Sequence, residues 1–282
     1  MDNYSLPRRI WRIIYPVLIF LAIQIFVGLL VSVVVSVAFG LQAAFGGDAF
    51  DASALADAVT RYLGESAIMV LLASNLVSLA VFLPMWLAAR KKSEPYMNRS
   101  PAALGLLVIG FFACFNIVQM FIFGVTDIMR FFPSYDEVVD VFEGGSILLQ
   151  VVTVGVLAPV VEELLFRGLL MSRMKWLPAW AAVALQAVIF GAVHLNWFQS
   201  LYALLAGVLL GMVYVKYKSI ILTMLAHIAY NLASVLLGEF MDDTVAMVVL
   251  LVCPVVTVVF GVLLLTRHRA VKRYAEPPLP MY

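Results

Sequence analysis

The sequence predicts an all-α polytopic membrane protein with about eight transmembrane helices and both termini in the cytoplasm. Its 282 residues are 64% hydrophobic and 12% charged, whereas soluble domains are about 45–50% apolar and about 25% charged. This composition excludes a disordered chain, a secreted disulfide scaffold and an ordinary soluble domain. Cys114 and Cys253 both lie in apolar runs, so we expect them to behave as small buried hydrophobes. Segment length and flanking charge are the other two observations behind the prediction.

Eight apolar segments are long enough, or nearly long enough, to cross a membrane. A helix rises about 1.5 Å per residue and needs roughly 20 apolar residues to cross about 30 Å of hydrocarbon. In chain order the predicted segments are 16–39, 67–89, 102–125, 147–171, 179–196, 199–215, 219–238 and 245–266. The first is too long for the apolar core of a signal peptide, which has about 7–15 residues. The fifth and sixth segments are short, and the boundary between them falls within 195–198. We expect one membrane domain over 1–282.

Basic residues flank these segments on one side of the membrane. If eight helices alternate, 15 of the 18 lysines and arginines fall on the same side. These are Arg8, Arg9, Arg12, Arg90, Lys91, Lys92, Arg99, Arg173, Lys175, Lys216, Lys218, Arg267, Arg269, Lys272 and Arg273. The loops on the other side contain only Arg61 and Arg130 as bases. Their acids are Asp48, Asp51, Asp57, Glu65, Asp127, Asp136, Glu137, Asp140, Glu143, Glu239, Asp242 and Asp243. An excess of Lys and Arg marks the cytoplasmic side, which places both termini inside the cell.

A few ionisable residues remain within the apolar segments. They are Glu162, Glu163, Arg167, His194 and His227. An ionisable group in hydrocarbon costs at least a few kcal/mol, so each is a candidate functional residue. Glu163 and Arg167 are four residues apart, share one helix face and can form an ion pair. Glu162 is rotated about 100° from Glu163 around the helix.

Two further features accompany these residues. Asn231 follows His227 by four residues, so the two side chains project together. Pro159 and Gly155 precede the glutamates, and a proline removes a helical hydrogen bond, which favours a kink that exposes backbone beside the site. A structural interpretation exists for each feature taken alone, because ion pairs, histidines and asparagines also join packed membrane helices.

Three motifs stand in order within this part of the chain. Residues Glu162–Arg167 fit EExxxR, Phe190–His194 fit FxxxH, and His227–Asn231 fit HxxxN. Together they resemble the CPBP family, the CAAX protease and bacteriocin-processing intramembrane endopeptidases, with a motif-bearing core at about 147–238. The resemblance implies an eight-helix protease that cleaves membrane-embedded or prenylated proteins or peptides in or near the lipid bilayer. We expect no nucleic-acid partner and a multi-pass protein of the bacterial plasma membrane.

Two mechanisms of peptide hydrolysis fit these residues. In the first, Glu162 and His194 activate a water molecule, while His227 and Asn231 stabilise the oxyanion and Glu163 pairs with Arg167. In the second, Glu162, His194 and His227 ligate zinc, and Glu163 becomes the candidate base. Both need all three motifs at one depth. Glu162 and His227 lie roughly 14–17 Å from the cytoplasmic boundary, and His194 reaches this level only if the fifth segment starts late or tilts.

Two other classes of function use the same residues. The ionisable groups of a transporter or channel line an ion or proton path. The sequence shows no internal repeat, and its intramembrane ionisable groups are confined to half of the chain, which argues against a transporter. A non-catalytic scaffold or immunity protein would keep the fold and bind a membrane partner, although the intact motifs favour an enzyme.

Overall fold

The computed structural model describes residues 4–45, 53, 56–57, 59–60, 62, 66–90, 102–135, 146–240 and 243–266. Within this part of the chain, eight helical stretches correspond to the eight predicted segments. They are α1 (Leu6–Phe45), α3 (Ala67–Arg90), α4 (Ala102–Thr126), a composite helix over 147–171, α8 (Ala179–Ala192), α9 (Trp197–Tyr217), α10 (Ile220–Phe240) and α11 (Asp243–Thr266). The composite helix consists of α6 (Ile147–Gln150), η3 (Val151–Leu157), α7 (Ala158–Glu163) and η4 (Leu164–Met171). Six of the eight are long and apolar enough to cross a membrane. The prediction of an all-α polytopic membrane protein is confirmed.

Two of the predicted segments differ clearly from the helices. The first helix, Leu6–Phe45, extends beyond both ends of the predicted segment 16–39. The fifth segment was expected to reach residue 196, but α8 ends at Ala192 and has only 14 residues. A turn follows, in which Leu195 adopts a left-handed conformation with φ of 58°. The side chain of Asn196 then begins α9 by accepting hydrogen bonds from the N–H groups of Phe198 and Gln199, both at 3.1 Å. An N-cap asparagine of this kind satisfies amides that the first turn of a helix leaves unpaired.

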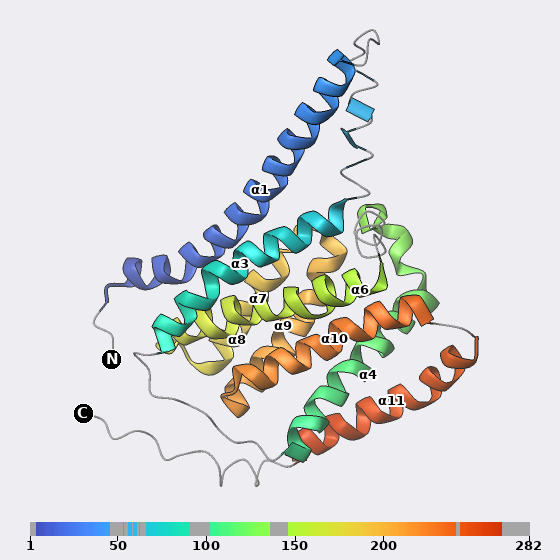
Figure 1. Cartoon of the computed structure of the whole chain (residues 1–282). Coiled ribbons are helices and arrows are strands. Elements are labelled where there is room, and N and C mark those ends of the chain that lie inside the picture. The colour runs from blue at the N-terminus through green and yellow to red at the C-terminus, as the bar shows by residue number, and fades with distance from the viewer. Residues whose placement is uncertain are drawn as a thin grey trace.

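The helices form one bundle from which part of α1 projects (Figure 1). The beginning of α1 packs on α3 and η4, through a buried cluster that contains Val17, Phe82 and Leu165. A second cluster joins α4 to α9 and α10 through residues such as Phe112 and Leu210. The later part of α1 extends away from the other described helices (Figure 1).

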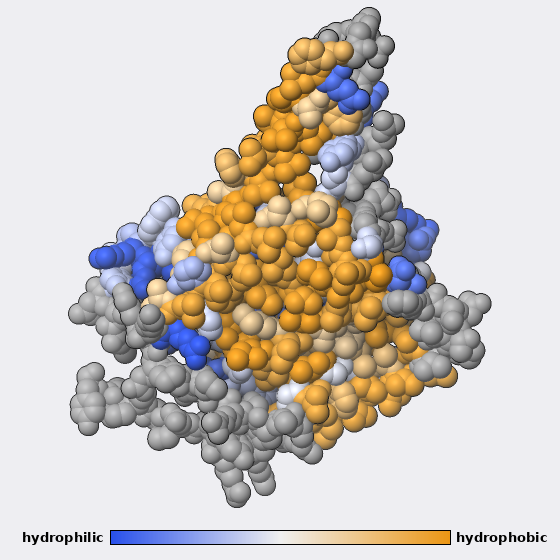
Figure 2. Space-filling model, viewed as in Figure 1, coloured by the Kyte–Doolittle hydropathy of each residue, from blue (hydrophilic) through white to orange (hydrophobic). Residues whose placement is uncertain are grey.

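Apolar side chains cover the outside of the bundle, and several polar side chains lie within it. Figure 2 shows a nearly continuous hydrophobic surface over the described helices. Phe26 and Val258 are 65% exposed, whereas Asn75 is 3% and Asn116 0% exposed. This arrangement suits a lipid environment, because lipid solvates apolar side chains while buried polar groups find partners or line a cavity.

The two ends of the bundle differ in charge, as the charge pattern predicts. At one end, Arg173 donates from Nη1 to the carbonyl of Arg12 at 2.6 Å and from Nη2 to the Tyr15 hydroxyl at 2.8 Å. Burial and the neighbouring charge of Lys175 both lower the pKa of Lys218, so the junction between α9 and α10 lies at this end too. We call this end the basic face, and its described bases are Arg8, Arg9, Arg12, Arg90, Arg173, Lys175, Lys216 and Lys218.

The opposite end contains the short 3-10 helices η1 (Ile128–Phe131) and η2 (Pro133–Tyr135) and the turn between α8 and α9. Asn196 in that turn donates a hydrogen bond to the carbonyl of Ser134 at 2.9 Å. The remaining residues of the charge pattern lie outside the described residues. They are Lys91, Lys92, Arg99, Arg267, Arg269, Lys272 and Arg273 of the predicted cytoplasmic side, and Asp48, Asp51, Arg61, Glu65, Asp136, Glu137, Asp140, Glu143 and Asp242 of the other. The cytoplasmic position of both termini stays a prediction.

Candidate active site

The composite helix is irregular where it passes the predicted glutamates. Its segments η3 and η4 are π-helical, a geometry in which N–H groups bond to carbonyls five residues earlier and which is frequent at functional sites. Pro159 at the start of α7 has no N–H to donate. In the π register that N–H would reach the carbonyl of Val154, which instead accepts a hydrogen bond from Asn231 Nδ2 at 2.9 Å. The proline thus frees a backbone acceptor, and α10 supplies the side chain that satisfies it.

A glycine allows α10 to approach the composite helix closely at this point. A Cβ atom at Gly155 would overlap the side chain of Leu232. The close approach places His227 of α10 beside both glutamates, with Nδ1 3.0 Å from Glu163 Oε1 and Nε2 3.6 Å from Glu162 Oε2. Because an ionised carboxylate only accepts hydrogen bonds, Nδ1 of His227 donates the hydrogen bond to Glu163.

The predicted ion pair between Glu163 and Arg167 is present and fully buried. Arg167 Nη1 lies 2.6 Å from Glu163 Oε1, and both side chains are 0% exposed. The other terminal nitrogen of Arg167 donates to the carbonyl of Gly207 in α9 at 3.1 Å. The guanidinium also lies over the ring of Phe190, 5.3 Å from its centroid. Glu163 and Arg167 therefore link the composite helix to α8, α9 and α10 from within the bundle.

His194 reaches the same site because α8 is short. Its Nδ1 lies 2.7 Å from the carbonyl of Phe190, one turn earlier. A carbonyl only accepts hydrogen bonds, so Nδ1 of His194 is the donor in this contact. The ring of Phe190 contacts the rings of both His194 and His227, with centroids 5.0 Å and 5.8 Å apart. Phe190 thus packs against one histidine of FxxxH and one of HxxxN.

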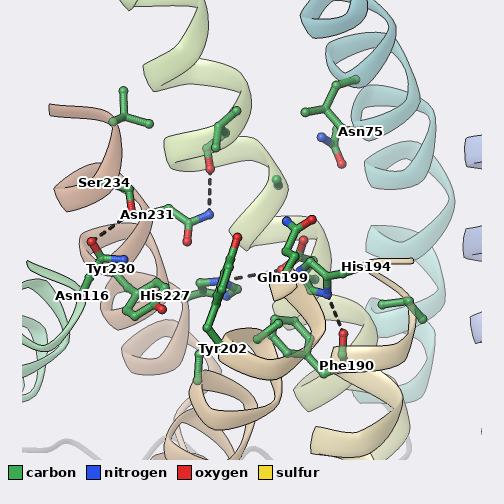
Figure 3. Close-up of a pocket in the computed structure, with 18 of the residues that line it drawn as sticks. Asn75, Asn116, Phe190, His194, Gln199, Tyr202, His227, Tyr230, Asn231 and Ser234 are labelled. Carbon is green, nitrogen blue, oxygen red and sulfur yellow. Dashed lines mark hydrogen bonds and ion pairs between the residues drawn. The ribbon is translucent and has the colours of Figure 1, made fainter. Parts of the chain in front are cut away.

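A cavity of about 990 Å³ lies in front of this cluster. Glu162, His194, His227 and Asn231 line it, whereas Glu163 and Arg167 lie behind its wall. Figure 3 shows the labelled histidines and Asn231 around this space. The six predicted residues thus form one cluster with two parts, a lining set that a substrate can reach and a buried pair that holds it.

Comparison with known proteins identifies the part of the chain that bears the motifs. Residues 144–233 match the family model described as Type II CAAX prenyl endopeptidase Rce1-like. This match agrees with the resemblance of the three motifs to the CPBP family. The match covers the composite helix, α8, α9 and most of α10, and with them all six predicted site residues. No curated protein and no solved structure matches the chain.

Several polar residues of the cavity lie outside the CPBP motifs. They carry no charge at neutral pH, so the sequence prediction from ionisable groups did not include them. Gln24 comes from α1, Asn75 from α3 and Asn116 from α4, while Gln199 and Tyr202 come from the beginning of α9. Asn75 lies across the cavity from Asn231 (Figure 3). The signal was present in the sequence, because an Asn or Gln within an apolar segment is also costly in hydrocarbon.

Three of these amides have an unused nitrogen at the cavity wall. Gln24 Nε2, Asn75 Nδ2 and Asn116 Nδ2 are buried and have no hydrogen-bond partner among the described residues. Asn116 uses only its oxygen, which accepts a hydrogen bond from Ser234 at 2.9 Å. An unpaired buried N–H costs about 1–3 kcal/mol, so the cavity is suited to a bound molecule that supplies acceptors.

The histidines and the carboxylate that line the cavity are residue types that bind zinc. Their side chains are not, however, arranged around one point as zinc ligands would be. Imidazole and carboxylate are common zinc ligands, and both histidines have the Nδ1 contact that orients a metal-ligating ring. Among the described residues, however, no group of three or more His, Cys, Asp or Glu side chains is placed to hold a metal ion. Glu162 and His227 approach one another directly, at 3.6 Å.

Proposed function

We propose that the protein is an intramembrane endopeptidase that hydrolyses peptide bonds of membrane-associated or lipid-modified proteins. The observation that carries the proposal is a cavity within the helix bundle that Glu162 and His194 both line. The match of residues 144–233 to a CAAX prenyl endopeptidase family supports the same class of reaction.

Glu162 is the better general base of the two adjacent glutamates. Glu163 has Oε1 engaged by Arg167 at 2.6 Å and by His227 at 3.0 Å, and its side chain is 0% exposed. Glu162 is 17% exposed and lines the cavity. A base must reach the proton it removes, which only the lining carboxylate does.

The proposed reaction is direct attack by water. Glu162 and His194 orient a water molecule, and Glu162 accepts a proton as the water oxygen attacks the carbonyl carbon of the substrate. In its doubly protonated form, His227 directs Nε2–H into the cavity, and with the amide of Asn231 it stabilises the oxyanion. The C–N bond then breaks as Glu162 returns the proton to the leaving nitrogen, which yields a carboxylate and an amine.

The cavity amides with unpaired nitrogens have a separate role in this proposal, which is to bind the substrate. Gln24, Asn75 and Asn116 present unpaired N–H groups, and the carbonyl groups of an extended peptide are acceptors of the required kind. We propose that they hold the substrate backbone beside the catalytic residues. Their binding is independent of side-chain sequence, because every peptide unit offers the same acceptor.

The experiment is cleavage of a membrane-anchored peptide library by the purified, lipid-reconstituted protein, with products identified by mass spectrometry. The wild type is expected to release fragments, Glu162→Gln to release none, and Glu239→Gln to behave as the wild type. Glu239 is a matched control because it is an exposed carboxylate that also lines the cavity, at the end of α10. Cleavage that survives Glu162→Gln would overturn the proposed site.

Zinc dependence is the second form of the same proposal, supported by the Nδ1 contacts of the two histidines. In that form Glu162, His194 and His227 would hold the metal, which would lower the pKa of a bound water molecule. Metal analysis of the purified protein separates the two forms. Stoichiometric zinc that disappears in His227→Ala would establish the metal form, and full cleavage by metal-free protein would exclude it.

Two non-proteolytic alternatives have their own tests. A transporter needs a path through the bundle, whereas the side chains behind the cavity are at most 1% exposed, namely Leu164, Leu165, Phe166, Arg167, Leu169 and Leu170. Ion flux into liposomes that is abolished by Glu162→Gln would support a transporter. A folded wild-type protein that cleaves no library member and transports no ion would instead support a scaffold or immunity protein.

A further inference from the structure

We propose that the cavity takes its substrate from the face opposite the basic face, and hence from outside the cytoplasm. That the molecule entering the cavity is a substrate rests on the proposed function, while the direction of access rests on geometry and charge alone. Four observations lead to it: the distribution of lining residues along the helices, the packing behind the cavity, the exposure at its rim and the position of the basic residues.

The lining residues of the bundle helices lie in the parts directed away from the basic face. In the composite helix, which ends at the basic face, they run from Gln150 to Glu162 and stop there. In α10, which begins at the basic face, they run from His227 to Glu239. In α9, which ends at the basic face, all of them precede Gly207. Figure 1 shows that α10 and the composite helix lie side by side and run in opposite directions.

Tight packing closes the cavity toward the basic face. Between Glu162 and the bases that follow η4, the side chains of Leu164, Leu165, Phe166, Arg167, Leu169 and Leu170 are 0–1% exposed. A Cβ atom at Gly168 would lie 2.7 Å from Trp86 of α3 and 3.2 Å from Ile220 of α10. Three helices therefore meet here without space for a peptide, because contacts below 3.0 Å force atoms to shift.

Exposure rises in the other direction. The side chain of Glu163 is 0% exposed, that of His227 4% and that of Glu162 17%, and Glu239 near the end of α10 is exposed. At the same end the cavity is lined by Gln199 and by Tyr135 of η2. The rim of the cavity thus lies among the 3-10 helices and the α8–α9 turn, which form the end opposite the basic face.

The charge pattern gives this end its side of the membrane. Lysines and arginines concentrate on the cytoplasmic side of membrane proteins, and the basic face contains Arg173, Lys175 and Lys218 next to the beginning of α1. The rim consequently faces away from the cytoplasm. The substrate class that fits is a membrane-anchored polypeptide whose scissile bond lies at the extracytoplasmic end of its anchor.

The test is cysteine labelling of the full-length chain in the plasma membrane of bacterial spheroplasts, with a sulfonated, membrane-impermeant maleimide as the probe. Cys114 and Cys253 are first replaced by alanine, and a single cysteine is then introduced at one of three positions. Gln199→Cys reports on the cavity, Ser134→Cys on the exposed surface of η2, and Lys218→Cys on the basic face. Labelling in detergent measures the total of folded, reactive protein for each variant.

We expect Gln199→Cys and Ser134→Cys to react in intact spheroplasts and Lys218→Cys to react only after permeabilisation. The reverse pattern would overturn the proposal, as would labelling of Gln199→Cys only after permeabilisation. Ser134→Cys keeps the test valid if the cavity variant fails to fold. The labelling requires no catalysis, so an inactive protein with the expected pattern would contradict the proposed function and leave the direction of access intact.

Discussion

The two halves of the composite helix differ in packing, and their difference separates chemistry from support. From Gln150 to Glu162 the helix contains a proline, a carbonyl that bonds to Asn231 of α10, and part of the wall of a polar cavity. From Glu163 to Met171 it is buried on all sides. Two adjacent carboxylates mark the boundary. Glu162 lines the cavity, whereas Glu163 is fully buried, with its Oε1 engaged by both Arg167 and His227.

Under the proposed function, this difference in burial assigns the catalytic role to Glu162 and the supporting role to Glu163. A reacting group needs access to substrate and water, whereas a supporting group needs fixed partners. The following predictions test this division, beginning with the open half.

His194→Ala is expected to lower the cleavage rate by about 10²–10⁴-fold, the usual contribution of a general acid–base group. The unfolding temperature should change little, because this side chain bonds to the Phe190 carbonyl one turn earlier and not to another helix. Peptide cleavage and thermal unfolding in the same lipid or detergent provide the measurements. Gln199→Ala is the control, since Gln199 lines the cavity without belonging to a motif. Equal losses in both variants would contradict a specific role for His194.

Arg167→Met is expected to lower the free energy of unfolding by about 3–5 kcal/mol, because it leaves a buried carboxylate without its cation. Chemical unfolding in mixed micelles measures the change. The control is Arg130→Met, which removes an exposed ion pair to Asp127 with N–O distance 3.5 Å and should have almost no effect. The double variant Glu163→Gln/Arg167→Met should recover part of the lost stability. A destabilisation no larger than that of Arg130→Met would refute the supporting role of the pair.

Gly168→Ala is expected to destabilise the packed half by about 1–3 kcal/mol, since the added methyl group meets Trp86 and Ile220. Gly28→Ala is the control, because an added Cβ at Gly28 has no atom within 4 Å, and alanine favours a helix. Unfolding of both variants under one set of conditions tests the comparison. Equal stability would mean that the packed half yields more easily than its contacts indicate.

Asn75→Leu is expected to raise KM by up to about tenfold with little change in kcat, since it removes one neutral hydrogen bond to the substrate backbone. The neighbouring Ser74→Ala is the control. Ser74 is also buried in α3, but its hydroxyl donates to the carbonyl of Leu71 and does not line the cavity. Steady-state kinetics on a peptide from the library distinguish the two parameters. A fall in kcat at constant KM would place Asn75 among the catalytic residues instead.

The sequence predicted those features that depend on local spacing. The positions of all eight helices follow from the length of apolar runs, and the ion pair between Glu163 and Arg167 follows from their separation by one helical turn. Pro159 also predicted a backbone carbonyl without its helical hydrogen bond, but it did not predict the partner of that carbonyl. Asn231 is far from Val154 in the chain, and only the packing of α10 brings them together.

Other features depend on tertiary packing, or involve neutral polar residues that a criterion based on charge does not select. Hydropathy did not locate the end of α8, because the turn depends on the left-handed Leu195 and the cap at Asn196. Asn75 and Asn116 were overlooked since they carry no charge, yet a neutral amide in an apolar helix is also costly to bury. The division of labour between Glu162 and Glu163 required knowledge of which one the neighbouring helices enclose.

The central claim is tested most directly by the cleavage rate of Glu162→Gln, measured on a peptide that the wild type cleaves. The account predicts a loss of at least about 10²-fold at an unchanged unfolding temperature, because this carboxylate faces the cavity and supports no buried partner at hydrogen-bonding distance. Wild-type cleavage by a folded Glu162→Gln protein would contradict it, and the catalytic base would have to be sought elsewhere.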